Sequence, residues 1–322
     1  MRFAPPTPTP RGFARRVPPA IFPPIMGLFG LGLGARRFAG LVDVPSALAE
    51  LLLGAITLLF LFALLAYGAK LVRRPAVLAD DLAVLPGRLG LSALFACLYL
   101  SAIVLHPYVP GLSGPLIVGA LILQLGLMVL ILRVLSTLPE AARQLRAAGH
   151  LYFTSPLVGA MAAALTGQAA LGKVLLAATL IVGAVIWLAD IAAMLRGRLA
   201  PPPLRPLLAL HLSVAAVAGI ASGALGYGAA AQAFAGLAAA TLLLMVLAAR
   251  WLTGSGFSAL WSAFTFPLAA TASLWLSLGG MWLWPGQAVL LAAAGIVPAI
   301  AFRVMKMWAG GQLAVKTNAA SA

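Results

Sequence analysis

The side chains that could carry out chemistry are few and scattered. The six acidic residues include one adjacent pair, Asp80-Asp81, and the three histidines are His106, His150 and His211. A lone acidic pair near arginines is more typical of a solvated, ion-paired loop than of a metal-diphosphate site, and the histidine spacings fit no metal-binding motif. No complete G-x-x-x-x-G-K-[ST] phosphate-binding loop is present. We therefore expect neither enzyme activity, nor a cofactor, nor ATP-driven transport by this chain.

The composition indicates an integral membrane protein. Of the 322 residues 63% are hydrophobic and only 8% charged, whereas a soluble domain has roughly a quarter charged residues. The apolar stretches recur at about 20 residues, the length of a membrane-spanning helix. A net charge of +15 would suggest nucleic acid as the partner of a soluble protein. Here the basic residues lie between apolar stretches, so we expect them to set the topology in the lipid bilayer, with no nucleic-acid partner.

The hydropathy pattern predicts ten membrane-spanning α-helices and no strand. They cover approximately residues 18–34, 46–69, 86–105, 113–136, 151–168, 172–194, 204–224, 226–249, 257–283 and 286–307. The loops are short, which indicates a single membrane domain at 17–308. We expect 1–16 to be a disordered cytosolic tail, since it is proline-rich and the apolar run after it lacks the end of a cleaved signal peptide. Residues 309–322 are expected to form a cytosolic C-terminal tail.

The distribution of Lys and Arg supports this span count independently. With ten spans, all but three of the 21 Lys and Arg residues fall on the side of the N-terminus. The three on the opposite side are Arg36, Arg37 and Lys173. Because basic residues concentrate in cytoplasmic loops, we expect both termini to be cytoplasmic and the protein to lie in the cell's inner (plasma) membrane.

Helix-breaking residues concentrate in the odd-numbered spans. Pro23 and Pro24 lie in the first span, Pro156 near the start of the fifth and Pro267 in the middle of the ninth. The even spans are richer in Leu and Ile. Broken helices are tolerated at membrane depth where they are buried in protein or line a wet cavity. The pattern favours an inner ring of odd helices within an outer ring of even helices; the alternative is that small residues only allow close helix packing.

Ionisable groups within a membrane normally mark ion or proton pathways, and this chain has almost none. His211, about two turns into the seventh span, is the best candidate. Two interpretations stay open for it: a histidine hydrogen-bonded between helices, or a pore-lining or proton-carrying group. Arg88 and Asp190 fall near helix ends, where we expect pairing or anchoring. Many spans with few buried charges are typical of a passive pathway.

Two segments resemble one known family. Residues 17–22 (VPPAIF), 27–32 (GLFGLG) and Arg36 resemble the first helix of the tellurite-resistance/C4-dicarboxylate transporter family, which includes the plant guard-cell slow anion channels. Residues 257–267 (FSALWSAFTFP) are similar to the ninth-helix signature, in which a tryptophan precedes a Phe-Pro pair. Weaker similarities follow in the same order, at 77–86, 152–159 and 204–218.

The resemblance implies ten helices in five hairpins about a quasi-fivefold axis, assembled as a homotrimer. Odd helices would line a central anion pore, and a phenylalanine of the ninth helix would close it. The matching position here is Phe266. The sequence departs from the family at Ser213-Val214, which replaces the seventh-helix proline, and in the third span, which lacks a central proline. These departures leave the pore shape and the substrate open.

We expect Phe266 to act as the gate, because a bulky apolar plug blocks ions by sterics and dewetting. Pro267 should push the preceding residue away from helical geometry and so let the phenyl ring move. The other predicted pore-lining or helix-kink residues are Pro23, Pro24, Gly27, Ser92, Ser155, Pro156, His211, Ser213, Thr265 and Pro267. Hydroxyls, helix-break amides and the basic rim would form a weak site that suits small monovalent anions, since nothing clamps a dicarboxylate.

Two alternatives to this anion channel stay open. The first is a proton-coupled carrier of C4-dicarboxylate, tellurite or sulfite-like oxyanions, with His211 as its proton site. The second is a membrane assembly subunit that transports nothing itself.

Overall fold

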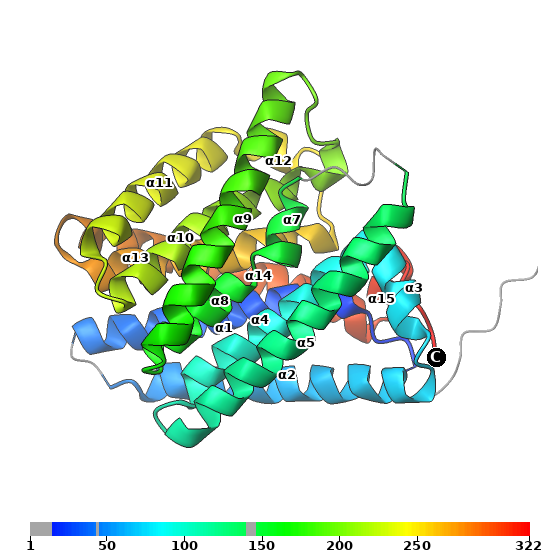
Figure 1. Ribbon diagram of the computed structural model, residues 1–322, viewed down its shortest axis with the longest axis horizontal. Helices are drawn as coiled ribbons and strands as arrows, with labels where there is room; N and C mark the ends of the chain where they lie inside the picture. Colours follow the sequence, from blue (N-terminus) through cyan, green and yellow to red (C-terminus); the bar gives the residue numbers. More distant parts are fainter. Residues whose placement is uncertain (1–14, 43–44, 140–145) are drawn as a thin grey trace, which may run out of the picture.

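The computed structural model describes residues 15–42, 45–139 and 146–322. Most of the predicted N-terminal tail and parts of two interhelical segments lie outside the described residues. The described part is helical and contains no strand (Figure 1). Eight of its helical segments are long and apolar enough to cross a membrane. The prediction of an all-α, multi-pass membrane protein is thereby confirmed.

Five helices are mostly buried, and each is followed by a longer, more exposed helix. The buried helices are α1 (Phe22–Leu41), α4 (Leu85–Leu105), α8 (Pro156–Leu165), α10 (Leu210–Ala224) and α13 (Thr265–Leu278). Their exposed partners are α2 (Ala47–Arg73), α5 (Pro110–Thr137), α9 (Ala169–Leu195), α11 (Gly228–Leu247) and α14 (Leu283–Ala309). In the most apolar stretch of α4 78% of residues are buried, against 28% in α5 and 17% in α11. Lipid is the natural solvent for such exposed Leu and Ile side chains.

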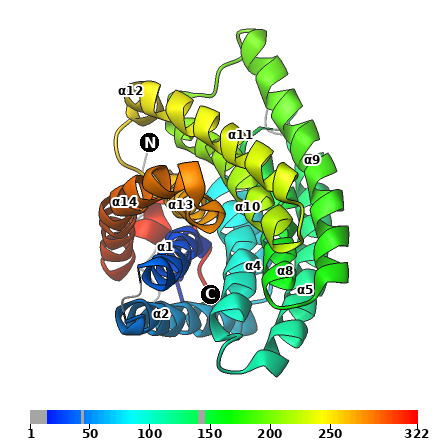
Figure 2. The same ribbon diagram turned by 90° about the vertical axis from the view of Figure 1, so that its left-hand side faces the viewer.

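The five buried helices contact one another in a closed cycle. α1 packs against α4, α4 against α8, α8 against α10, α10 against α13, and α13 against α1. Each also packs against the exposed helix that follows it, so that α2, α5, α9, α11 and α14 lie around the cycle (Figure 2). We call the five members of the cycle the inner helices.

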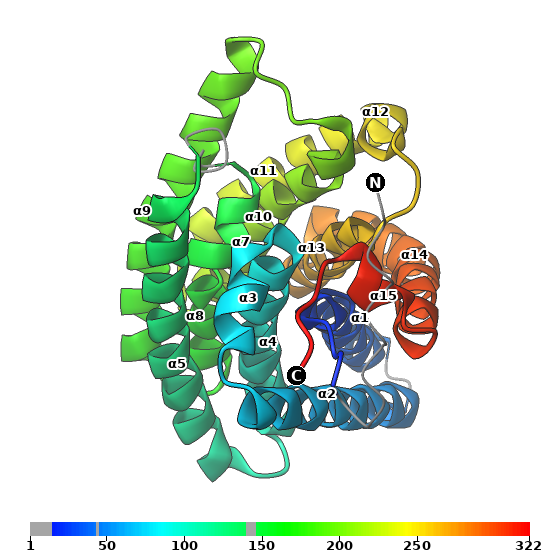
Figure 3. The same cartoon turned by 90° about the vertical axis from the view of Figure 1, so that its right-hand side faces the viewer.

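Each inner helix is preceded in the chain by a short helical element. These are η1 (Pro19–Ile21), α3 (Val77–Ala83), α7 (Ala148–Phe153), η2 (Pro202–Ala209) and η3 (Ala259–Phe264). Figure 3 shows the end of the molecule at which α3, α7 and the last short helix, α15 (Gln312–Lys316), lie. The remaining short elements are α12 (Ala249–Thr253) and η4 (Gly280–Trp282).

The prolines expected to kink the odd spans lie in the first turns of inner helices rather than in their middles. Pro23 and Pro24 lie in the first turn of α1, Pro156 begins α8, and Pro267 lies in the first turn of α13. The N–H groups of a first turn have no intrahelical partner, so proline costs little there. The break in each span therefore comes before the proline, at the junction with the short preceding element.

Two predicted spans are not among the eight long apolar helices. The span expected at 18–34 corresponds to η1 and α1, whose prolines, glycines and paired Arg36-Arg37 lower its average hydropathy. The span expected at 151–168 is divided into α7 and α8, and α8 has only 10 residues.

The acidic pair Asp80-Asp81 is solvated only in part. Asp80 forms an exposed ion pair with Arg74, at 2.8 Å, as expected of a loop. Asp81 is fully buried instead, and its carboxylate accepts hydrogen bonds from Lys70 Nζ at 2.8 Å, Tyr67 Oη at 3.1 Å and the Ala320 backbone N–H at 2.9 Å. The buried ion pair between Lys70 and Asp81, with the Ala320 N–H, thus connects α2, α3 and the segment after α15.

Candidate functional site

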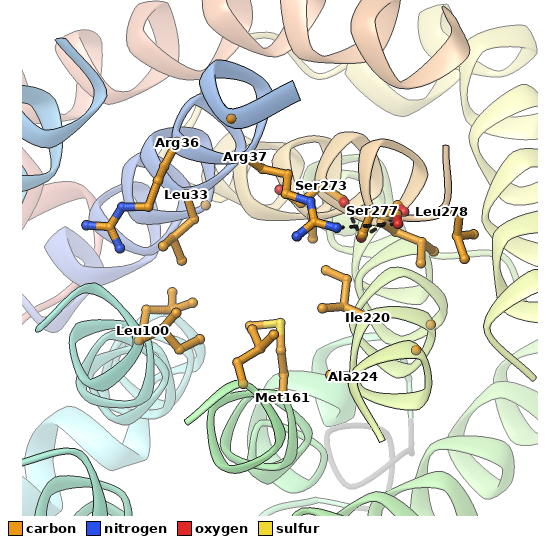
Figure 4. A pocket seen from close by; sticks show the side chains of 18 of the residues that line it. Leu33, Arg36, Arg37, Leu100, Met161, Ile220, Ala224, Ser273, Ser277 and Leu278 are labelled. Carbon is orange, nitrogen blue, oxygen red and sulfur yellow. Dashed lines mark hydrogen bonds between the residues drawn. The ribbon is translucent and has the colours of Figure 1, made fainter. Parts of the chain in front are cut away.

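A large cavity lies at the C-terminal ends of the inner helices. Its volume is about 860 Å³, and all five inner helices contribute to its lining. Figure 4 shows side chains that line it, among them Leu33 of α1, Leu100 of α4, Met161 of α8, Ile220 of α10 and Leu278 of α13. A second, small cavity of about 50 Å³ lies nearer the N-terminal ends of α1, α4, α10 and α13 and is lined by residues such as Pro23, Leu89 and Leu210.

The charged side chains described in the lining of the large cavity are both basic. Among the described residues its only charged lining side chains are Arg36 and Arg37. Arg36 is balanced by Glu50, to which Nε and Nη2 donate at 2.6 and 2.5 Å. Arg37 donates to the Ser277 carbonyl oxygen at 3.4 Å and has no carboxylate partner in the described part of the chain. Within the described residues, one guanidinium charge in the cavity thus has no counter-charge.

Tyr108 completes the Arg36 ion pair. This residue lies between α4 and α5, and its hydroxyl donates to Glu50 Oε2 at 2.6 Å. The hydrogen bond to the Glu50 carboxylate raises the pKa of the Tyr108 phenol, because ionising the phenol would place two negative groups together. The Glu50 carboxylate is therefore engaged by two partners. Glu50 is not among the residues that line the large cavity.

Phe266 separates the two cavities. Of the residues that the structure describes it alone lines both, and it is only 4% exposed. It lies in the first turn of α13, directly after the η3–α13 junction. The expectation that Pro267 excludes the preceding residue from a helix therefore differs from the structure, in which the helix begins at Thr265. The irregular backbone lies on the N-terminal side of Phe266.

Glycines of α1 make room for this part of α13. A Cβ added at Gly30 would lie 3.1 Å from Cδ2 of the Phe266 ring, and a Cβ added at Gly27 would overlap the Thr265 side chain. The close approach of α1 and α13 therefore needs glycine at both positions, and it places the phenyl ring against the α1 backbone.

The predicted hydroxyl residues occupy different environments. Ser213 lines the small cavity, and Ser155 lines a third space of about 20 Å³, here called the side cavity. Thr265 is fully buried and donates to the Ser262 carbonyl oxygen at 2.7 Å, so its hydroxyl proton is already engaged. Ser92 is fully buried on α4, and its Oγ has no hydrogen-bond partner among the described residues.

Of the four predicted prolines, two line the small cavity and two are buried between helices. Pro23 and Pro267 line the small cavity, whereas Pro24 and Pro156 are buried between elements. Ser273 and Ser277 of α13 line the large cavity although the sequence pattern did not single them out. Their spacing of four residues puts them on one face of α13, which is the signal that could have found them.

His211 belongs to a buried polar chain. Its Nδ1 lies 2.9 Å from His150 Nε2, and its Nε2 lies 3.0 Å from Asp190 Oδ2. These contacts join α7, α9 and α10, so the interhelical hydrogen bonding considered for His211 is present. His150 and Asp190 were not predicted as its partners, because 61 and 21 residues separate them from His211 in sequence.

A comparison of the sequence with protein-family models found no matching model, and a comparison with curated proteins found no match.

Proposed function

We propose that this protein conducts small anions across a membrane, along a pathway through the large and small cavities that Phe266 closes. The observation that carries the proposal is the position of Phe266, which is shared by both linings. A phenyl ring between two cavities blocks ions by sterics and by excluding water. Removing the ring would join the two spaces.

In this proposal α1 and the α7–α8 segment also span the membrane, which gives ten spans. The inner helices then surround the pathway, and the outer helices face lipid. The positive-inside rule puts the small cavity toward the cytoplasm and the large cavity toward the outside. Both chain termini are then cytoplasmic, in the cell's inner membrane.

The charges of the lining favour anions of low charge. Arg37 attracts anions into the large cavity, because no described carboxylate balances it. Beyond Phe266, the small cavity offers hydroxyls such as Ser213 and Ser262 and, among the described residues, no charged lining side chain. A dicarboxylate would lose hydration there without an arginine to replace it, whereas a monovalent anion loses less.

Opening requires the Phe266 ring to leave the axis. The side chain can do so by rotating about its own χ angles, since the irregular η3 segment directly precedes α13. The resemblance to the tellurite-resistance/C4-dicarboxylate transporter family gives the same role to this position and also suggests a homotrimer. Light scattering of the purified protein tests the oligomeric state.

The test of the gate is anion flux through liposomes that contain the purified protein. Phe266→Ala should raise chloride and nitrate efflux about tenfold or more, because it removes the plug without adding charge. Phe264→Ala is the matched control, since Phe264 lies on the adjacent η3 and lines neither cavity. Both variants must keep the elution volume of the wild type.

Two results would overturn the proposal. Equal, low flux in both folded variants would remove Phe266 as the gate. No anion flux in any variant would favour the non-transporting subunit. Reversal potentials in chloride, nitrate, sulfite and malate gradients then identify the anion.

A further inference from the structure

A chain of hydrogen bonds runs from the edge of the bundle toward its axis. Arg146 Nη1 lies 3.1 Å from Asp190 Oδ1, and the Ala147 backbone N–H donates to Asp190 Oδ2 at 3.0 Å. His211 then lies 3.0 Å from the same carboxylate, and His150 lies 2.9 Å from His211. Asp190, His211 and His150 are all buried.

The hydrogen atoms in this chain can be assigned from its fixed end. Asp190 is ionised, because it pairs with Arg146 and accepts a backbone N–H. His211 Nε2 must then carry a proton to donate to Asp190, which in a neutral imidazole leaves Nδ1 as an acceptor. His150 Nε2 donates to that acceptor, so His150 Nδ1 holds a free lone pair.

This last nitrogen is the unsatisfied end of the chain. His150 is 3% exposed, and its Nδ1 has no hydrogen-bond partner in the described part of the protein. A buried polar atom without a partner is uncommon and calls for a ligand or an ion. A neutral imidazole nitrogen has one obvious ligand, a proton.

His150 faces the pathway. It lines the side cavity, which shares Met26, Leu151, Leu210 and Ser213 with the small cavity below Phe266. An anion held near Ser213 would therefore border the side cavity that His150 also lines. The side cavity alone, at about 20 Å³, holds no more than a water molecule, so the anion itself would occupy the small cavity.

The described charged groups around His150 leave one positive charge, that of Arg88, beyond the Arg146–Asp190 pair. The Arg146 and Asp190 charges balance each other, and His211 is neutral in the assignment above. On the other side, α4 contributes Arg88, whose guanidinium lies 5.9 Å from the ring centre of Tyr152 on α7. A proton on His150 would add one positive charge in a dry site, which is costly by itself and becomes favourable when an anion lies next to it.

We propose that His150 Nδ1 binds one proton together with one anion in the small cavity, while His211 and Asp190 hold the imidazole in place and stabilise its charge. The proposal rests on the anion pathway proposed above. By linkage, a proton that tightens anion binding is itself bound more tightly when the anion is present. Anion binding should therefore take up a proton from solution.

The first experiment measures this proton directly. Nitrate is added to the purified protein in weakly buffered detergent solution at about pH 7, and a pH indicator should record uptake of about one proton per chain at saturation. His150→Gln keeps an N–H at the position of Nε2 and removes the titratable nitrogen, so it should abolish the uptake. His106→Gln, which changes a histidine bonded to Ser113 instead, should leave it intact.

A spectroscopic measurement covers the case in which His150→Gln does not fold. The chain has three histidines, so the ring nitrogens of the ¹⁵N-labelled wild type should give three resolvable sets. Nitrate should convert the ring-nitrogen signals of one histidine from the neutral to the doubly protonated pattern. The same conversion should occur in His106→Gln. No conversion at saturating nitrate would overturn the proposal.

A flux measurement separates this proposal from the gate. In the Phe266→Ala background, nitrate flux should rise several-fold from about pH 8 to pH 6, and His150→Gln should remove that rise. High nitrate flux that depends neither on pH nor on His150 would contradict the proton site at His150, while the proposed anion pathway would stand. Proton uptake that depends on His150, together with no nitrate flux in Phe266→Ala, would support the proton site and contradict the role of Phe266 as the gate.

Discussion

The phenyl ring of Phe266 lies against the backbone of Gly30. A Cβ built on Gly30 would lie 3.1 Å from Cδ2 of the ring and 3.1 Å from the Ala269 Cβ. Such contacts are tighter than ordinary packing, so the missing side chain at position 30 is what allows the ring to occupy the axis. The position of the proposed gate therefore depends on two helices, α1 and α13.

Gly30→Ala should shift the Phe266 ring and destabilise the closed state. We expect a loss of about 1–3 kcal/mol in the free energy of unfolding, as for other overpacked sites, and an increase in anion flux smaller than that of Phe266→Ala. The same glycine substitution in the Phe266→Ala background should cost less, because the ring is absent and only the close contact with the Ala269 Cβ remains. Equal costs in both backgrounds, measured by unfolding in mixed detergent, would show that Gly30 does not support the ring.

Arg37→Gln should lower anion flux through the opened pathway. In the Phe266→Ala background we expect a drop of about three- to tenfold at low ionic strength, because no described carboxylate balances the Arg37 charge in the large cavity. The difference should shrink above about 0.5 M salt, where charges are screened. Lys173→Gln is the control, since Lys173 is predicted on the same side of the membrane and lines neither cavity. An equal drop in both variants would exclude a specific role for Arg37.

The helical content and the membrane class could be predicted from the sequence because they depend on local hydropathy. Stretches such as Ala47–Arg73 and Ala169–Leu195 are long and apolar, and nothing in the fold overrides that pattern. The first span was harder to place, since Pro23 and Pro24 suggested a kink within a helix. The preceding 3-10 turn, Pro19–Ile21, moves the break ahead of them, and its position depends on packing against α4.

The candidate site could be predicted only in part, because the inner helices carry mostly apolar or small side chains on every face. Nothing in the local pattern shows that the Thr265 hydroxyl donates to the Ser262 carbonyl oxygen, whereas Ser213 lines a cavity. The contact between His150 and His211 is a tertiary one, made between α7 and α10. Phe266 was found through a family resemblance, and its place between two cavities emerged only from the fold.

Glu50→Gln should have the opposite effect to Arg37→Gln. Loss of the Glu50 charge leaves Arg36 unbalanced in the lining of the large cavity. In the Phe266→Ala background we expect anion flux at low salt to rise about twofold or more. Adding Arg36→Gln should cancel the rise, and Tyr108→Phe, which removes a hydrogen bond to Glu50 but no charge, should not reproduce it. A rise that persists without Arg36 would contradict this account.

Removing one partner of the buried pair Lys70–Asp81 should strongly destabilise the other end of the bundle. Both side chains are fully buried, and Lys70 Nζ also donates to the Val17 carbonyl oxygen at 2.9 Å, which ties α2 to the start of the described chain. Lys70→Met leaves the Asp81 charge buried and unpaired, so we expect a loss of about 3–5 kcal/mol. Arg74→Gln breaks the exposed pair with Asp80 and should cost no more than about 1 kcal/mol.

The double variant Lys70→Met/Asp81→Leu distinguishes a buried charge from lost packing. If the unpaired carboxylate causes the loss, removing it should restore a large part of the stability, because apolar replacements of a buried ion pair are often neutral. Unfolding in mixed detergent, followed by tryptophan fluorescence, measures each step. A double variant that is as unstable as Lys70→Met would assign the loss to lost contacts instead, those of Lys70 with Val17 and Tyr67 or those of Asp81 with Tyr67 and Ala320.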